Sequence, residues 1–350
     1  MNDRPYDGSD EYWDFFAGEA AKLNAPLYVR FAQGVKADLQ LRALAAHARQ
    51  GQPHANTLFA TVHFLLLRGA KHRLRNFYPN LSPAVPAGDP FPSFHDFCLE
   101  HQPEIVAHLE KRVTNTNEVG RSPFLYAGFA ALAKEAREPF QLIEIGPSAG
   151  LNFYWDRYGY RFLKDGQAIA AGAPDAKLVI ETPLKGECVP PTGAALKIGK
   201  RLGLERDPVD LSNEDDRDWL KSLVWPDHKL RFERLELALA VNAGWPHDIR
   251  KGDAVELMAD ALAEMPEEGT LCVYHTMTIY QFPTEAKRAL ENIFTLASVR
   301  RPIYRLSLEW MDRAYPLALA HYRDGAVTTR TLGFCGPQGS WLEWRGLAAE

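Results

Sequence analysis

The residues from Gln141 to Arg157 have the types and the spacing of a nucleotide-binding turn. An apolar run ending near Glu144 predicts a buried strand, and Gly146 to Gly150 predicts a tight turn into a helix. Glycines let a backbone approach a ligand, the first N–H groups of a helix are free to donate, and a carboxylate at a strand end can bind hydroxyl or amino groups. The pattern therefore predicts a small-molecule site, although a turn that is tight only for packing fits the same residues.

A histidine in another apolar segment is the best candidate for a catalytic base. His275 lies in the segment from Thr270 to Tyr280, which predicts a strand that ends in polar groups. An imidazole near the carboxyl end of a central strand would titrate near neutrality and lie close to a ligand, as a general base must. Tyr280 and Glu309, close to the ends of their predicted strands, are secondary catalytic candidates. A histidine buried only for packing is the commoner alternative.

A polar loop from Thr114 to Arg121 brings amides, an acid and a guanidinium group together just before a predicted helix. Arg121 could bind a carboxylate or phosphate of a substrate while Asn115 and Asn117 orient it, and Glu118 belongs to the same candidate substrate site. The alternative is a polar hinge that satisfies the start of the helix and joins two parts of the chain.

Asn152 and Asp156 follow the glycine turn in a predicted short helix. Their spacing of four residues places them on one helix face, so both could point into the crevice at the strand ends. We expect Asn152 to contact a cofactor there and Asp156 to contact a substrate. An ordinary surface pair fits the same spacing.

Other catalytic patterns have little support. The cysteines show no CxxC pair and the histidines no HExxH or comparable spacing, so we expect neither a metal site nor a disulfide framework. No Walker lysine is present, and Ser148 has glycine at the wrong offset for a serine nucleophile elbow.

Composition limits the class of protein. The chain has 350 residues, 46% of them apolar and 24% charged, which is typical of a globular protein with one large domain or two modest ones. The net charge is -5 and no long run of Lys and Arg occurs, so a nucleic-acid partner is not expected and a small molecule or a protein is favoured. The polar amino terminus and the lack of a long apolar run predict a cytoplasmic protein without membrane contact. The oligomeric state is not predicted.

Periodicity changes near residue 120. Residues 12–81, 94–112 and 122–134 predict helices, the last capped by Ser122, and the proline-rich segment 81–92 predicts a connector. We therefore expect a helical amino-terminal domain over residues 1–120 and an α/β domain over residues 121–350, with a β-rich insertion around residues 158–195.

The second part alternates strands and helices, which indicates a Rossmann-like, mostly parallel sheet. A closing antiparallel pair is expected from residues 321–334 and 340–344. Strands are predicted at 141–146, 158–172, 177–183, 202–205, 247–251, 270–280 and 302–310, and helices at 214–224, 228–243, 255–265 and 284–298.

This succession resembles the class I S-adenosylmethionine-dependent methyltransferases, whose parallel core also ends in an antiparallel hairpin. The middle glycine of that family's usual G-x-G-x-G pattern is absent, because Ser148 or Ala149 stands in its place. By resemblance, the turn would hold the methionine end of the cofactor, Glu205 the ribose hydroxyls and Asp253 the adenine. The cofactor-binding residues implied are Glu144, Gly146, Ser148, Gly150, Asn152, Glu205 and Asp253.

A second resemblance covers nearly the whole chain and is to a bacterial family catalogued as domain of unknown function 2332. It implies no established activity. The similar phrases are PLY from Pro26, HFLLLRG from His63, TNTNEVGRS from Thr114, EIGPSAGLNFYWDRYGY from Glu144, PVDLS from Pro208, WLKSLVWPD from Trp219 and YHTMTIY from Tyr274.

Three functions remain open on the sequence. The first is an S-adenosylmethionine-dependent methyltransferase that acts on an unknown small-molecule or protein substrate. The second is a nucleotide or small-molecule binding protein with the same fold and no catalysis, and the third is a scaffold for protein interactions. Direct attack on a methyl sulfonium needs mainly alignment and sometimes one base, so few catalytic residues are expected for the first.

Overall fold

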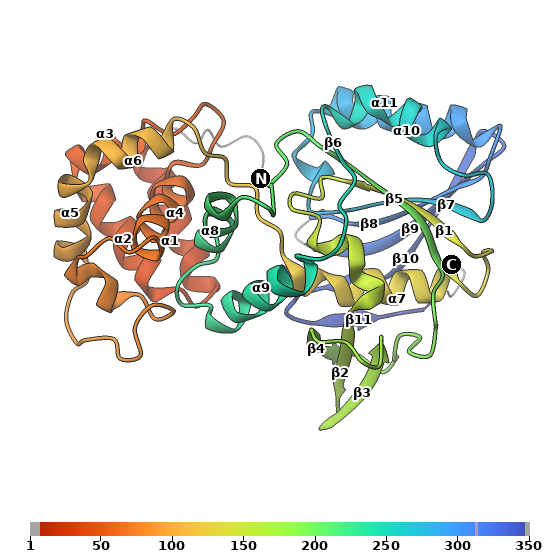
Figure 1. Cartoon of the computed structure of the whole chain (residues 1–350), viewed down its shortest axis with the longest axis horizontal. Helices are drawn as coiled ribbons and strands as arrows, with labels where there is room; N and C mark the ends of the chain where they lie inside the picture. The colour runs from red at the N-terminus through yellow and green to blue at the C-terminus, as the bar shows by residue number, and fades with distance from the viewer. Residues whose placement is uncertain (1–7, 312–313, 347–350) are drawn as a thin grey trace. The chain divides into compact units, whose positions relative to one another are not determined.

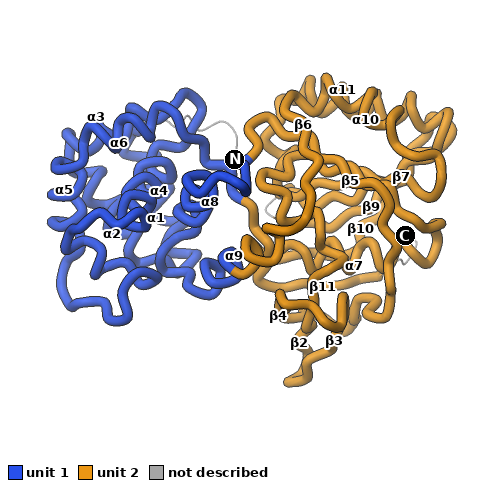
Figure 2. Tube along the Cα trace, in the orientation of Figure 1, with its two compact units in different colours: residues 1–116, 209–236 blue, residues 117–208, 237–350 orange. Residues whose placement is uncertain are grey.

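The computed structural model describes residues 8–311 and 314–346. They form two compact units, and each unit is built from two separate stretches of chain (Figure 2). Unit 1 combines Met1–Thr116 with Val209–Glu236, and unit 2 combines Asn117–Pro208 with Leu237–Glu350. The chain therefore passes between the units three times.

Helices make up the regular structure of the described part of unit 1. Helix α9 (Lys229–Asn242) begins in unit 1 and ends in unit 2. The other helices of unit 1 are α1 (Asp10–Lys22), α2 (Pro26–Ala37), α3 (Leu39–Ala45), α4 (His54–Leu67), the 3-10 helix η1 (Arg73–Phe77), α5 (Phe91–Glu100), α6 (Gln102–Leu109) and α8 (Glu214–Ser222).

Helix α4 is buried on nearly all sides, as expected of a helix whose sequence is apolar all round. Its Phe59 ring contacts the rings of five aromatic residues: Trp13, Phe16, Tyr28, Phe31 and Phe94. The second stretch of unit 1 completes this core. Trp225 contacts Phe16, with 5.6 Å between ring centroids, and Trp219 contacts Phe64 at 6.0 Å.

Two local predictions in the helical segments were wrong. The helix expected over residues 94–112 is interrupted between Glu100 and Gln102, because Pro103 can start a helix but cannot continue one. Ser122 does not cap the next helix, α7 (Ser122–Leu132), since its hydroxyl donates to Asn152 instead. For α8 the cap is Asn213, whose side chain accepts the backbone N–H of Asp215.

An eleven-stranded, mostly parallel sheet forms the centre of unit 2 (Figure 1). Its order is β3-β2-β4-β11-β10-β9-β8-β7-β1-β5-β6. The strands are β1 (Phe140–Ile145), β2 (Gly159–Lys164), β3 (Gln167–Gly172), β4 (Val179–Lys185), β5 (Ile198–Glu205), β6 (Ile249–Lys251), β7 (Thr270–Thr276), β8 (Ile303–Leu308), β9 (Pro316–Arg323), β10 (Ala326–Cys335) and β11 (Leu342–Trp344).

Helices cover both faces of the parallel strands. Helices α10 (Ala254–Ala263) and α11 (Thr284–Ser298) lie over one face, where Met258 and Phe294 pack against Ile143 and Val273 (Figure 1). Helix α7 lies on the other face, where its Phe129 ring meets the Tyr274 ring edge-on. The bounds of α11 are those predicted from its sequence.

The closing strands differ from the prediction at one turn. Residues 321–334 do not form a single strand, because Asp324 and Gly325, at φ 53° and 77°, turn the chain between β9 and β10. Two consecutive residues with positive φ form the two-residue turn typical of Asp-Gly hairpins. Strands β10 and β11 pair antiparallel, as expected for the end of the chain. Beyond them, β4 joins the antiparallel β2–β3 pair to the sheet.

The strand order defines where the site residues meet. After β1 the chain adds β5 and β6 on one side, and then crosses to place β7 and β8 on the other side. Strands β6-β5-β1-β7-β8 are all parallel, in the arrangement of a doubly wound fold. The carboxyl ends of β1 and β7 therefore form a topological switch point, the position at which such sheets bind ligands.

Candidate functional site

Two loops meet at the switch point, one after β1 and one after β7. The loop after β1 contains three residues with positive φ, namely Gly146, Ser148 and Gly150, and the loop after β7 contains Met277 at φ 56°. A side chain on Gly146 would collide with Thr278, so the two loops are in close contact. Left-handed conformations in residues other than glycine are rare and often occur at functional sites.

The carboxylate of Glu205 binds the loop after β1. Glu205 ends β5 and is 9% exposed. Its Oε2 accepts the backbone N–H of Ser148 at 2.9 Å, and its Oε1 accepts that of Asp207 at 3.1 Å. An N–H group that an anionic ligand could use is therefore already bonded to a carboxylate of the protein.

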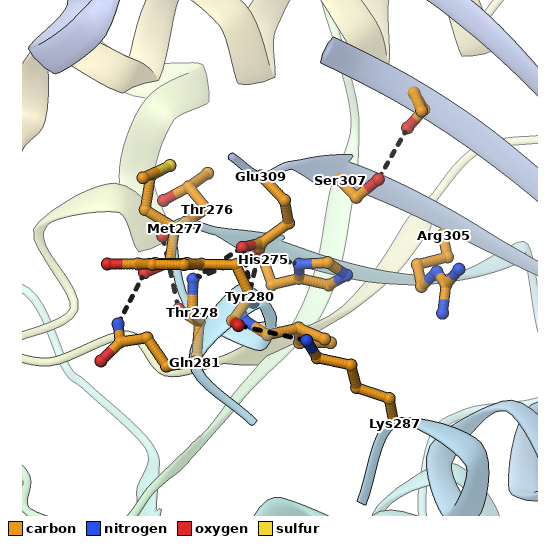
Figure 3. A network of polar contacts seen from close by, with 12 residues as sticks. His275, Thr276, Met277, Thr278, Tyr280, Gln281, Lys287, Arg305, Ser307 and Glu309 are labelled. Carbon is orange, nitrogen blue, oxygen red and sulfur yellow. Dashed lines mark hydrogen bonds and ion pairs between the residues drawn. The ribbon is translucent and has the colours of Figure 1, made fainter. Parts of the chain in front are cut away.

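Glu309 binds the loop after β7 in the same way (Figure 3). Its carboxylate accepts the backbone N–H groups of Thr278, Ile279 and Tyr280 at 3.0 to 3.1 Å. Burial alone would raise the pKa of Glu309, but the hydrogen bond and charge of His275 and these backbone N–H groups outweigh it, and the pKa is lowered. The carboxylate is therefore ionised at neutral pH. The strand predicted to reach Tyr280 ends at Thr276, because the next residues turn to face Glu309.

His275 forms a buried pair with Glu309. Its Nδ1 lies 2.5 Å from Glu309 Oε1, and because a carboxylate can only accept, we assign the proton to Nδ1 (Figure 3). The other ring nitrogen, Nε2, has no hydrogen-bond partner among the described residues, and the side chain is 2% exposed. The pair with Glu309 therefore holds the ring in one orientation, with Nε2 as the ring nitrogen that Glu309 does not bind.

Glu144 lies on the opposite face of the same sheet. It is 2% exposed, and its Oε2 accepts the hydroxyl of Tyr274, its register partner on β7, at 2.9 Å. Burial raises the pKa of Glu144 to about 8, the Tyr274 hydrogen bond and Arg121 oppose that rise, and Glu205 adds to it. Glu144 is therefore mostly protonated at pH 7.

The polar loop before α7 is bonded to the helix that follows the glycine turn. Asn117 Oδ1 accepts the Leu151 N–H at 2.9 Å. Asn152 accepts the Ser122 hydroxyl at 2.7 Å and donates to the Glu118 carbonyl at 3.4 Å. Since these bonds join the loop to η3 (Leu151–Arg157), they position both segments beside Glu144.

The remaining candidates are held by other contacts. Asp156 forms a two-pronged ion pair with Arg201, with both distances 2.8 Å. Asp253 caps α10 and pairs with Arg206 at 2.6 Å. The Arg121 guanidinium donates to the Thr276 carbonyl at 3.2 Å, and Tyr280 contributes its backbone N–H to Glu309. Asn115 belongs to unit 1 and the other candidates to unit 2.

The structure adds Thr278 and His247, which were not among the candidate site residues and which fill the space beside Gly146 and Gly150. Tyr274, which begins the YHTMTIY phrase, is the hydroxyl partner of Glu144. Pairing the predicted strands would have placed Tyr274 opposite Glu144, but no sequence signal marks His247. Among the described residues, no group of three or more His, Cys, Asp or Glu side chains could hold a metal ion. No helix in the same described residues is both long and apolar enough to cross a bilayer.

Comparison with known proteins places the chain in a family. A family model described as "Uncharacterized protein conserved in bacteria", domain of unknown function 2332, matches residues 11–344. The chain belongs to this family. Neither a curated protein nor a solved structure matches the chain. The match to this family model covers residues of both units. The family model therefore includes the helical segments as well as the sheet.

Proposed function

We propose that the carboxyl ends of β1, β5 and β7 bind a small cationic molecule, and that this molecule is S-adenosylmethionine in a methyltransferase. One observation carries the proposal: Glu205 holds the N–H of Ser148, so the glycine turn is occupied by a carboxylate. A phosphate at this turn would compete with that carboxylate and be repelled by it. An anion would also be repelled at the loop after β7, because the Glu309 carboxylate already accepts the N–H groups of that loop.

The electrostatic surroundings favour a cation over an anion. Glu118, Glu144, Glu205 and Glu309 are each less than a tenth exposed, and Arg121 is the cation that acts on Glu144. Buried acids are stabilised by a positive partner, because the attraction offsets the loss of hydration. A nucleotide polyphosphate would find the opposite conditions.

The residues fit S-adenosylmethionine through their carboxylates. Glu205 has both oxygens bonded to N–H groups, yet each carboxylate oxygen can accept a second hydrogen bond, which suits ribose hydroxyls. Glu144 is mostly protonated without a ligand, and an ammonium group of the ligand beside it would favour its ionised form. When bound, S-adenosylmethionine supplies an electrophilic methyl group on a sulfonium.

The His275–Glu309 pair suits the proton transfer that methylation of a hydroxyl or amino group requires. Glu309 holds Nδ1, so in the neutral ring Nε2 is the nitrogen that could take a proton from the substrate. Tyr280 lies in the loop held by Glu309, to which its backbone N–H donates. The substrate is an unknown small molecule or protein, and Asn117, Glu118, Arg121 and Asp156 remain its candidate contacts.

A ligand-binding protein without catalysis is the second candidate. It is favoured by the burial of the candidate base: His275 is 2% exposed and its Nε2 is a buried atom, so a bound ligand does not by itself bring a substrate to this nitrogen.

Calorimetric titration tests the proposal. The protein is first unfolded and refolded to remove any ligand retained from the cell, and is then titrated with S-adenosylmethionine, S-adenosylhomocysteine and ATP. We expect saturable binding of S-adenosylmethionine, weaker binding of the uncharged thioether, and none of ATP. Glu205→Gln should weaken binding at least tenfold, while Glu264→Gln, at an exposed ion pair in the same unit, should leave it unchanged.

Two results would separate the candidates. Binding of ATP in preference to S-adenosylmethionine would refute the cation site. Tight S-adenosylmethionine binding without methyl loss in the presence of cell extract, including extracts supplying protein acceptors, would favour the non-catalytic function.

A further inference from the structure

A cluster of buried oxygens without partners lies in unit 1, and it belongs to no site described above. Tyr28 is 1% exposed and Tyr78 0%, and neither phenol oxygen has a hydrogen-bond partner among the described residues. The same holds for Asn80 Oδ1 and Asp227 Oδ2, both also buried. Because buried polar atoms are nearly always bonded, four in one region call for an explanation.

Contacts and charges connect these four side chains. The rings of Tyr28 and Tyr78 lie 6.3 and 6.2 Å from the Phe31 ring. Burial raises the pKa of both phenols most, the charge of Asp227 adds to the rise at Tyr28, and Tyr28, Cys98 and Asp227 add to it at Tyr78. The Tyr78 ring lies 5.3 Å from the His63 ring, and His63 bonds Asn80. The cluster therefore joins α2, the segment after η1 and the segment before α9 within a single unit.

The hydrogen bond with His63 determines which end of the Asn80 amide has no partner among the described residues. Burial lowers the pKa of His63 to about 4, so the ring is neutral. Its Nδ1 donates to the Ser222 carbonyl at 3.0 Å, which leaves Nε2 to accept the Asn80 NH2 group at 2.9 Å. Asn80 Oδ1 is therefore an acceptor, and its orientation follows from the hydrogen-bond network.

Aromatic rings pack against the Tyr28 ring. The Tyr28 ring lies 5.0 Å from Phe59, 5.6 Å from Trp225 and 6.3 Å from Phe31, measured between centroids. Ring faces attract cations, and a partly buried carboxylate gains from a positive partner. Burial raises the pKa of Asp227 to about 6, although backbone hydrogen bonds from Leu27 and from Asp227 itself oppose the rise, so at pH 7.5 this carboxyl is mostly ionised.

We propose that Tyr28, Tyr78, Asn80 and Asp227 form a binding site for a small organic ammonium ion, the cluster supplying oxygen acceptors and aromatic faces. Asn80 Oδ1 and ionised Asp227 can only accept, and the two phenols can accept as well as donate. A primary ammonium group offers three N–H donors and a charge opposite to that of Asp227. The site is separate from the switch point in unit 2, so it stands whether or not the proposed function is correct.

The test uses the full chain and n-propylammonium chloride as the probe. Titration at pH 7.5 is followed by calorimetry and by the fluorescence of Trp225, compared with a Trp225→Phe variant to isolate its signal. n-Propanol, of similar size but uncharged, is the matched ligand control. We expect saturable binding of the ammonium ion with a fluorescence change, and no saturable binding of the alcohol.

Variants locate the site. Asp227→Asn should weaken ammonium binding at least tenfold, and Tyr28→Phe, which removes an unbonded hydroxyl and should fold normally, should weaken it severalfold. Asp14→Asn, at an exposed ion pair of α1, should have no effect. Thermal melting followed by circular dichroism identifies any variant that fails to fold. If Asp227→Asn fails to fold, the affinities of Tyr28→Phe and Tyr78→Phe for the ammonium ion test the proposal instead.

Four results would overturn the proposal. They are the absence of saturable ammonium binding, equal binding of n-propanol, unchanged affinity in the folded variants, and a crystal structure grown with the probe in which only ordered water bonds the four oxygens.

Discussion

Glu205 and Ser148 are joined by a hydrogen bond from the Ser148 backbone N–H to the Glu205 carboxylate, although they lie on different strand–loop units of the sheet. Glu309 has the same relationship with Thr278 and its neighbours. In both cases the acid at the end of one strand holds the loop that follows an adjacent parallel strand. The loops at the switch point are thus fixed by the protein itself, which reduces the ordering that a ligand would otherwise have to impose.

The Glu309→Gln variant should be markedly less stable. Glutamine places an NH2 group where the carboxylate accepts from His275 and from three backbone N–H groups, so at least one donor loses its partner. Hydrogen bonds to a buried charged group contribute about 1.5–3 kcal/mol each, and we expect a loss of about 2–4 kcal/mol in the free energy of unfolding. Urea unfolding measures it. Glu267→Gln, at an exposed ion pair with Arg300, is the control and should change stability by less than about 0.5 kcal/mol. Equal effects of the two variants would show that the Glu309 contacts are unimportant.

Gly150 and Gly166 allow backbone strain and crowding to be separated. Their φ angles are 75° and 76°, but a Cβ on Gly150 meets His247 whereas one on Gly166 meets open space. Gly166→Ala should therefore lower the free energy of unfolding by about 1–2 kcal/mol, which is the cost of holding alanine in the left-handed backbone conformation without any steric clash. Gly150→Ala should lower it by about 1–3 kcal/mol more, because the neighbouring side chain must move. Thermal and urea unfolding of both variants provide the comparison, and equal losses would contradict the crowding at Gly150. For this reason Gly150 variants are unsuitable for testing ligand binding.

Glu144 should make unit 2 less stable as pH rises. Its pKa is about 8 in the folded protein and 4.5 ordinarily, so between these values the unfolded chain is ionised while the folded chain stays protonated. The contribution of this group is fully present below pH 4.5 and is lost as pH rises toward 8. Relative to Glu144→Gln, the wild type should lose up to about 1.4 kcal/mol of unfolding free energy per pH unit from pH 5.5 to 7.5. Urea unfolding of both proteins at several pH values measures the difference. A difference that does not vary with pH would mean that Glu144 is ionised in the folded protein.

His63 should have the opposite effect in unit 1. Its pKa is lowered from 6.5 to about 4 by burial, so the folded protein resists protonation that the unfolded chain accepts. Its contribution is present above pH 6.5 and is lost as pH falls toward 4. Compared with His63→Gln, the wild type should lose up to about 1.4 kcal/mol per pH unit over that range. The imidazole can also be followed directly by nuclear magnetic resonance, where a titration near pH 6.5 in the folded protein would rule out the effect.

The sequence predicted local structure better than contacts between distant residues. Helix α11 and the strand over Phe140–Ile145 follow from regular apolar spacing, which depends only on nearby residues. The turn at Asp324 and Gly325 was missed although Asp-Gly is a strong hairpin signal, because the flanking residues read as one continuous strand.

Within the candidate site, residue types were predictable and their bonding was not. Glu309 was a candidate on its position alone, but its bond with His275 and its three N–H donors depend on how β7 and β8 are aligned. Asp156 shows the same limit, because its partner Arg201 lies on β5 just before the strand predicted at 202–205, and nothing near Asp156 in the sequence indicates this pairing. Long-range pairing decides which polar groups remain available to a ligand.

The discontinuity of unit 1 has a consequence for protein synthesis. Helices α1 to α6 emerge from the ribosome well before residues 209–236 are synthesised. These later residues supply Trp219 and Trp225 to the same aromatic core. Domains generally fold as units once their chain has emerged, so this unit cannot be completed while the strands of unit 2 up to β5 are being made. During that interval the nascent chain carries Phe16 and Phe64 without their tryptophan partners, and the earliest helices depend on a segment that is translated later.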